Sequence, residues 1–389
     1  MGKDSLRRNF RGVPGTWKRI KQENRPGSKG GIEETIKIQK MDILKDNSSI
    51  DRRSFVKISG AMGLSLAYEV IIPRAAEALN IKKEPYKVSR TKVAMGTIVS
   101  MTLVSTSREI AEEAMALAYE EITRLSDLMD RFDERSPIAR LNREGMLKDA
   151  HPDIIEVISN ALKYYSLTGG AFDITVKPVI DLFKKKFSAG EDEYPSEDEI
   201  KEVLNLVGSD KIGLNGRDIS LKKPGMGITL DGIAKGYIVD RASVILLERK
   251  IENHLINAGG DIKAMGIRAD GKPWTVAIQD PVKKNNLLDL IHLTDIAVAT
   301  SGNYENYFDR EKIFHHIVNP KTGHSPVLNA SASVIAPTTM EADVLATSLV
   351  VMNPTDGLRL IDSLHQCEAL VISSTNQIKR SVGWKSFAT

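Results

Sequence analysis

The chain of 389 residues has a single cysteine and few aromatic side chains, and each shortage limits the classes of function that it can have. Its single cysteine, Cys367, excludes both an intrachain disulfide and a metal cluster held by several thiolates. A metal ion would therefore need oxygen or imidazole ligands, and the many carboxylates and hydroxyls favour Mg²⁺ or Ca²⁺. Aromatic residues make up only 5% of the chain and the net charge is only +3, so the composition does not indicate nucleic-acid binding.

Several well-known catalytic motifs are also absent. The sequence has no GxGxxG after an expected strand and no GxxxxGK[ST], which excludes the usual dinucleotide and P-loop sites. It has no GxSxG and no HExxH, the motifs of serine hydrolases and zinc proteases. What remains is an ordinary globular composition, 41% hydrophobic and 27% charged, with room for one large or two medium domains.

The N-terminal part of the chain does not show the pattern of a folded domain. Residues 1–50 are polar, without sustained periodicity, and are expected to be a disordered leader. Within residues 51–78, Arg52 and Arg53 precede a moderately apolar run and a set of small residues, the order of a twin-arginine export signal. The alternative is an N-terminal amphipathic helix, because Glu69 interrupts the apolar run. We therefore expect export to the periplasm or cell envelope.

From residue 86 onward, helical and strand patterns alternate irregularly. This predicts a domain over 86–389 of the α+β (mixed α/β) class, with a mixed sheet and flanking helices. Strands are expected in 86–104, 228–230, 254–266, 274–281 and 328–336, and 296–308 is expected to begin as a strand and break into a loop. Helices are expected in 107–129, 152–167, from about 197, in 234–250 and in 340–351. Residues 130–145 are expected to form a loop.

Five segments place glycines and polar residues where strands or helices meet loops. They are TGGAFDITVKP (168–178), TLDGIAKGYIVD (229–240), NAGGDIKAMG (257–266), ATSGNYENYF (299–308) and EADVLATSL (341–349). Each is weak alone, because a glycine pair is usually a turn and an Asp and a Thr four residues apart are usually solvated. Together they offer backbone amides suited to phosphate and, in Asp343 and Thr347, two hard oxygen ligands on one helical face.

A sixth segment, HHIVNPKTGH (315–324), holds three of the seven histidines. Neighbouring residues of a strand point to opposite faces, so only one of His315 and His316 can face a given site. We expect His316 to face the site, His315 to point away and His324 to belong to the turn. The plainer alternative is a polar turn with solvated or backbone-bonded histidines.

Taken in order, these segments resemble the ApbE family of FAD:protein FMN transferases. The resemblance runs from about residue 86 to the C-terminus and includes MGTIVSM, DRFDERSPIARLN, TGGAFDITVKP, DGIAKGYIVD, INAGGDI, ATSGNYENYF, HHIVNPKTG and EADVLATSL. It implies a T-shaped, two-part α/β fold and a Mg²⁺-dependent enzyme with FAD as substrate. Such an enzyme cleaves FAD, attaches FMN through a phosphoester to a Thr or Ser hydroxyl of a target protein, and releases AMP.

The resemblance also implies partners and residue roles. The expected partner is an acceptor flavoprotein subunit of an electron-transfer complex, and no nucleic-acid partner is expected. Peripheral membrane association is one possibility, and the sequence does not indicate the oligomeric state. The implied FAD contacts are Met95, Phe132, Ala171, Phe172, Asp173, Thr229, Lys235 and Ile317. The implied metal ligands and neighbours are Gly232 through its carbonyl, Asp343, Ala346 and Thr347. The implied catalytic residues are His316 and Asp343, with a metal-bound water as a further candidate for the base.

The sequence departs from the family pattern at two places. Where the family commonly has DLGG, this chain has TLDG, so the acidic residue is shifted by two positions to Asp231. In the histidine turn, Asn319 replaces an aspartate and keeps a turn-forming side chain without its charge. Two other functions fit the same residues: an exported FAD-binding protein, and an FAD pyrophosphatase that uses water in place of the acceptor.

Overall fold

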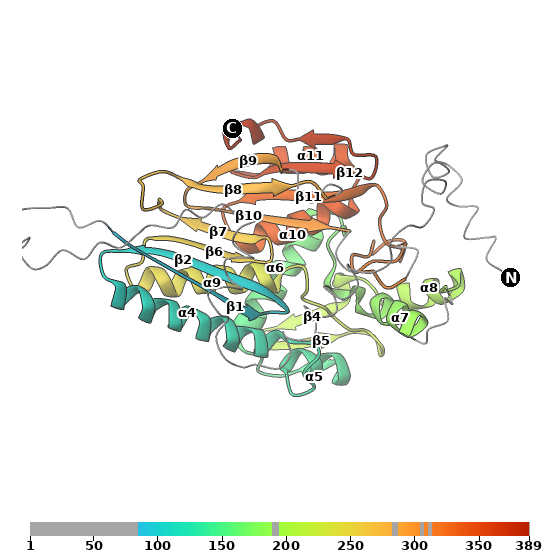
Figure 1. Cartoon of the computed structure of the whole chain (residues 1–389). Coiled ribbons are helices and arrows are strands. Elements are labelled where there is room, and N and C mark those ends of the chain that lie inside the picture. The colour runs from blue at the N-terminus through green and yellow to red at the C-terminus, as the bar shows by residue number, and fades with distance from the viewer. Residues whose placement is uncertain (1–84, 189–193, 282–286, 304–306, 310–312, 389) are drawn as a thin grey trace, which may run out of the picture. The chain divides into compact units, whose positions relative to one another are not determined.

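The computed structural model of the chain describes residues 85–188, 194–281, 287–303, 307–309 and 313–388 (Figure 1). All of them fall in one unit, Ile81–Thr389. The expected leader (1–50) and export signal (51–78) lie outside the described residues. Among the helices that are described, none is both long and apolar enough to cross a membrane.

The centre of the fold is an eight-stranded sheet in the order β1-β2-β6-β7-β10-β11-β12-β13. Its strands are β1 (Tyr86–Ala94), β2 (Thr97–Ser105), β6 (Asn253–Ala258), β7 (Asp261–Met265), β10 (Ile296–Gly302), β11 (Asn329–Ala336), β12 (Glu368–Ser373) and β13 (Ile378–Arg380). The predicted α+β class is confirmed. Every pairing between these described strands is antiparallel, so the sheet differs from the mixed sheet that was expected.

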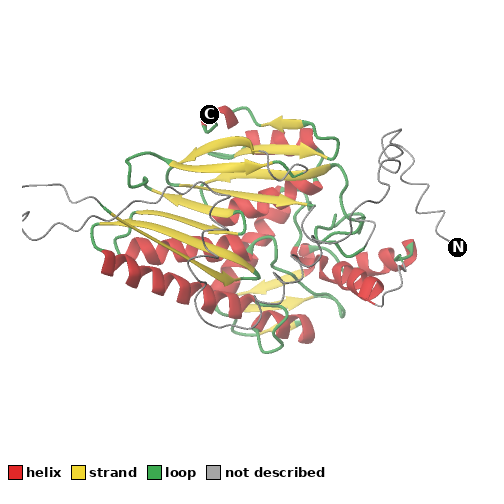
Figure 2. Cartoon of the chain, in the orientation of Figure 1, coloured by secondary structure: helices red, strands yellow, loops and turns green. Residues whose placement is uncertain are grey.

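Successive residues of the central strands bury their side chains on opposite faces of this sheet. Val334 and Val371 belong to the large core under the helices, whereas their neighbours Ile335 and Leu370 belong to a second core on the other face. The first face is covered by α4 (Arg108–Met129), α9 (Ala234–Glu248) and α10 (Thr339–Val351), and the second by the hairpin of β8 (Trp274–Gln279) and β9 (Leu287–Leu293) (Figures 1 and 2). Two covered faces explain why strand β11 is buried almost throughout.

The other elements surround this sandwich. A small sheet in the order β3-β5-β4 consists of β3 (Met146–Leu147), β5 (Asp218–Leu221) and β4 (Ile212–Asn215). The remaining α-helices are α5 (Pro137–Glu144), α6 (Pro152–Leu167), α7 (Lys177–Ser188), α8 (Glu197–Leu204) and α11 (Pro354–Asp362). Helices α7 and α8 pack on each other and contribute to a third, aromatic-rich core that contains Phe183 and Phe314.

Two local predictions are wrong. Residues 130–145, expected to be a loop, contain helix α5, which Ser136 caps at its start, Pro137 opens and left-handed Gly145 ends. Residues 228–230, expected to be a strand, run outside any sheet because a side chain takes the place of a neighbouring strand. Ile228 N–H donates to the Asn142 amide oxygen at 2.6 Å, and the Asn142 amide donates back to the Ile228 carbonyl at 3.0 Å.

Two buried histidines make stability depend on pH. His254 lies between the Ser243 hydroxyl and the Ile251 carbonyl, and burial lowers its pKa from 6.5 to about 4. Burial does the same for His315, also to about 4. Because the folded pKa lies below the unfolded one, protons bind preferentially to the unfolded chain.

We therefore expect the free energy of unfolding to be highest above pH 6.5 and to fall as the pH is lowered towards 4, by up to about 3 kcal/mol per histidine. Urea unfolding across this range measures the effect. His254→Asn should reduce the slope of the free energy of unfolding against pH. The same change at exposed His365 should leave that slope unchanged. A flat profile from pH 6.5 to 4 would contradict this account.

Candidate active site

Helices α9 and α10 approach each other more closely at one point than side chains would allow. A Cβ atom on Gly236 would lie 2.5 Å from the Thr339 carbonyl oxygen and 2.7 Å from the Met340 Cα. Only glycine permits this contact. As a result, the Gly236 N–H in the first turn of α9 reaches the Asp343 carboxylate on α10 and donates to it at 3.1 Å.

Asp343 lies in a cluster of two carboxylates and one ammonium group. Its side chain is buried, and burial together with the neighbouring Asp261 carboxylate raises the pKa of Asp343 above its usual range. The Lys235 ammonium forms an ion pair with Asp261 and acts in the opposite direction on Asp343. A cation bound beside Asp343 would favour its ionised form, so the cluster is suited to a metal ion.

The other implied metal ligands lie one helical turn away. Thr347 follows Asp343 by four residues, and its hydroxyl lies 3.1 Å from the Ser301 hydroxyl at the end of β10. Gly232, in the turn before α9, faces it: a Cβ atom there would lie 3.2 Å from Thr347 Oγ1 and 3.3 Å from the Phe172 ring. Ala346 is fully buried in the core beside Thr347. The structure thus brings together Gly232, Phe172 and the two α10 residues.

The chemistry of these donors fits Mg²⁺. A carboxylate, a hydroxyl and a backbone carbonyl are hard oxygen ligands, which Mg²⁺ prefers. Across the described residues there is no group of three or more His, Cys, Asp or Glu side chains that could hold a metal ion. Much of the coordination shell of a metal ion at this site would therefore come from water or substrate phosphate.

Asp173 has a structural role that sequence reasoning missed. Its carboxylate accepts hydrogen bonds from the backbone and hydroxyl of Thr175, at 2.8 and 2.6 Å, and from those of Ser209, at 3.1 and 2.7 Å. It anchors the segment that carries Ala171 and Phe172. Because the carboxylate is occupied by these four bonds, its implied FAD contact stays a prediction that this geometry does not favour.

The remaining implied FAD residues differ in their exposure and local contacts. Met95 has φ of 52° in the β1–β2 turn and packs against the main core. Thr229 is buried, and its hydroxyl accepts from the Asp231 backbone at 3.3 Å. Phe132 is 68% exposed after α4, whereas Ile317 is buried in the core. Their contacts with FAD stay predictions.

The three histidines of the turn differ in environment. His315 is buried: its Nε2 lies 3.0 Å from the Pro326 carbonyl, and its Nδ1 accepts from the Ile317 backbone at 3.3 Å. These two contacts occupy both ring nitrogens, as expected for a histidine that does not take part in the site. His324 lies 3.5 Å from the Glu197 carboxylate. His316 is half-buried, its ring 6.2 Å from that of His315, and its catalytic role stays a prediction.

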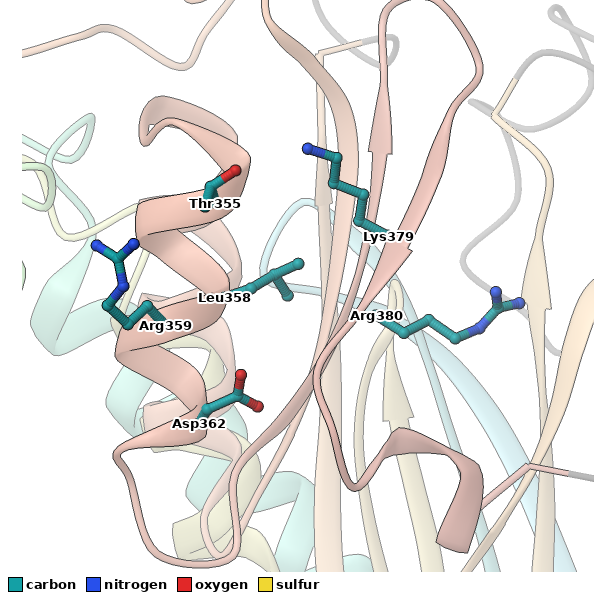
Figure 3. A pocket seen from close by; sticks show the side chains of 6 residues that line it. All are labelled: Thr355, Leu358, Arg359, Asp362, Lys379 and Arg380. Carbon is teal, nitrogen blue, oxygen red and sulfur yellow. The ribbon is translucent and has the colours of Figure 1, made fainter.

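A cavity of about 570 Å³ lies elsewhere, between α11 and β13 (Figure 3). Its lining includes three basic residues, Arg359, Lys379 and Arg380. The two guanidinium groups point away from each other, and each already pairs with an aspartate, at 3.1 and 3.4 Å. These cations do not converge on one point, and none of the implied site residues lines the cavity, so we do not assign it to the site.

Comparisons with known proteins agree with this geometry. The model of the ApbE family matches residues 95–371. The FAD:protein FMN transferase of Vibrio cholerae is 32% identical over 279 residues, which cover 69% of this chain and 81% of the relative. The enzyme of the same name from Haemophilus influenzae is 30% identical over 337 residues, 82% of this chain and 92% of the relative. The crystal structure of the ApbE protein from Thermotoga maritima superimposes with a TM-score of 0.70 at 30% identity, over 78% of this chain and 99% of that one. The chain belongs to the ApbE family.

Proposed function

We propose that the protein is a Mg²⁺-dependent FAD:protein FMN transferase. It cleaves FAD, attaches FMN through a phosphoester to a Thr or Ser hydroxyl of an acceptor protein, and releases AMP. The observation that carries the proposal is that Asp343 meets the first turn of α9 while Thr347, on the same helical face, meets Gly232 just before that turn. Family membership supports the transfer reaction, because relatives that cover most of the chain are FAD:protein FMN transferases.

The reaction replaces the phosphoanhydride bond of FAD by a phosphate ester bond to the acceptor. The acceptor oxygen attacks the FMN phosphorus, the bond to the AMP oxygen breaks, and the hydroxyl proton passes to a base. Asp343, Thr347 and the Gly232 carbonyl would hold Mg²⁺, which supplies neutralisation of the pyrophosphate charge. Of the amides in the first turn of α9, which the sequence led us to expect on phosphate, those of Ala234 and Gly236 already donate to the Leu230 carbonyl and the Asp343 carboxylate. We assign the role of the base that accepts this proton to His316. Asp343 is the less suitable candidate because it would bind the metal and already accepts a hydrogen bond from the Gly236 N–H.

We propose that the enzyme works outside the cytoplasm, exported by the twin-arginine route. The support is the Arg52–Arg53 pair, the apolar run and the small residues that follow in the sequence. That route carries folded proteins, which suits an enzyme with one cysteine. The acceptor is then a flavoprotein subunit of an exported or membrane-bound electron-transfer complex, and a peripheral contact with the membrane is compatible with such a partner.

Mass spectrometry tests the proposed reaction directly. The full chain is mixed with FAD, Mg²⁺ and an acceptor domain that carries a flavinylation threonine. We expect the acceptor to gain the mass of one FMN minus water, and EDTA to abolish the gain. Free FMN and AMP with unmodified acceptor would identify a pyrophosphatase instead, and intact FAD would identify a flavin-binding protein.

A further inference from the structure

An ion pair joins the loop after α4 to the turn before α9, two segments that are 100 residues apart. The Arg131 guanidinium donates to the Asp231 carboxylate, from Nη2 at 2.7 Å and from Nε at 3.2 Å to each oxygen. The Arg131 side chain is only 8% exposed, although Asp231 is 56% exposed. Because the guanidinium is largely buried and bonds through two nitrogens, this ion pair has a fixed orientation that most surface ion pairs lack.

Each end of this pair is the chain neighbour of a residue implied in substrate or metal binding. Asp231 immediately precedes Gly232, which faces Thr347 and Phe172. Arg131 immediately precedes Phe132, and its guanidinium carbon lies 4.2 Å from the centre of the Phe132 ring. The Lys184 ammonium lies 4.7 Å from the same ring, so an exposed aromatic side chain is held by two cations.

A second link connects the same two parts of the chain. The Asn142 amide on α5 makes two hydrogen bonds with the backbone of Ile228, three residues before Asp231. The loop after α4, helix α5 and residues 228–231 are thus tied at two points. The distance between Phe132 and Gly232 is therefore set by these links and not by the flexibility of either turn.

This arrangement gives a physical reason for the shifted acidic residue. Position 229 is buried, with Thr229 at 6% exposure, whereas position 231 reaches Arg131. An aspartate at 231 therefore finds a guanidinium partner and avoids the cost of a buried charge.

We propose that the Arg131–Asp231 ion pair positions the FAD site, by holding the exposed Phe132 ring at a fixed place relative to the Gly232 backbone. Arg131 is a positioning residue: it acts through Asp231 and Phe132. The inference rests on the proposed function, because FAD is the ligand that the two segments would share.

Charge removal and charge exchange test the proposal. The variants are Arg131→Gln, Asp231→Asn and the exchanged double variant Arg131→Asp/Asp231→Arg, measured by FAD fluorescence titration in Mg²⁺ and by transfer kinetics. We expect each single variant to weaken FAD binding and raise KM about 5- to 30-fold, the range of a one- or two-kcal/mol interaction, with kcat changed less than about threefold. The exchanged variant should recover most of the lost affinity.

A matched control breaks another ion pair of the same length. Arg268 pairs with Asp270 at 2.7 Å. This pair follows the C-terminal end of β7, whereas Asp261 is at the other end of that strand. The Arg268→Gln variant should therefore bind FAD like the wild type. Wild-type affinity in both single variants would overturn the proposal, with or without a fall in melting temperature. An exchanged variant as weak as the worse single variant would also overturn it, because Arg131 would then act on FAD directly. FAD binding is measured without acceptor, so a failure of the transfer reaction alone would count against the proposed function and not against this pair.

Discussion

Replacing Asp343 by alanine will reduce FMN transfer by about a thousandfold or more while leaving the protein folded. Asp343 is the one carboxylate among the implied metal ligands and lies within hydrogen-bond distance of the α9 backbone. A thousandfold loss corresponds to about 4 kcal/mol of transition-state stabilisation, within the several kcal/mol that a metal ion supplies. The measurement is acceptor mass against time at saturating FAD.

Loss of the charge at position 343 should cost little stability, in contrast to most changes at buried positions. Burial and Asp261 raise the pKa of Asp343, so the folded state disfavours the ionised carboxylate at neutral pH. In EDTA, we therefore expect Asp343→Asn, which keeps the shape and an acceptor for the Gly236 N–H, to melt at or above the wild-type temperature. This isosteric variant also separates loss of charge from loss of packing.

The matched control for activity is Asp356→Ala. Asp356 is exposed on α11, pairs only locally with Arg359 at 3.1 Å and lies outside the site, so its loss should leave transfer unchanged. Full transfer by Asp343→Ala at low Mg²⁺ would remove Asp343 from the metal site. Unfolding of both Asp343 variants would instead show that the carboxylate is needed for the fold.

The parts of the site that were predictable from sequence are those fixed by local geometry. Asp343 and Thr347 share a helical face because they are four residues apart, and the 3.1 Å contact of Thr347 with Ser301 follows once helix α10 packs on β10. The contact of Lys235 with Asp261 joins residues on α9 and β7, and no local pattern predicts which of the chain's many carboxylates a lysine will reach.

The misjudged elements of the fold have identifiable causes. Helix α5 carries Ser-Pro at its start and Gly145 at its end, so its signals were present but were outweighed by the charged composition of the segment. Helix α7 was not predicted, although its buried Val179, Ile180 and Phe183 have helical spacing and pack with Phe314 in a local core. The strand order follows from long-range pairing, such as β2 with β6, across about 150 residues.

The second large effect concerns Gly236, where we expect alanine to destabilise the protein by about 2 kcal/mol or more. In an exposed helix the same change would stabilise by up to about 1 kcal/mol, because alanine has the higher helix propensity. Here the added Cβ would lie 2.5 Å from the Thr339 oxygen and 2.7 Å from the Met340 Cα, which are backbone atoms that cannot rotate away. The two helices must separate, and forced overpacking of this kind costs about 1–3 kcal/mol or more.

Gly357 on α11 provides the matched control for this substitution. A Cβ atom there would meet the Leu349 side chain at 2.5 Å, at the end of a flexible group that can move, so Gly357→Ala should change stability by less than about 1 kcal/mol. Separation of α9 from α10 would also withdraw the Gly236 N–H from Asp343, so FMN transfer should fall together with stability in Gly236→Ala alone. Urea unfolding and acceptor mass measure the two effects, and a Gly236→Ala protein as stable and active as the wild type would show that the α9–α10 contact does not set the geometry of the site.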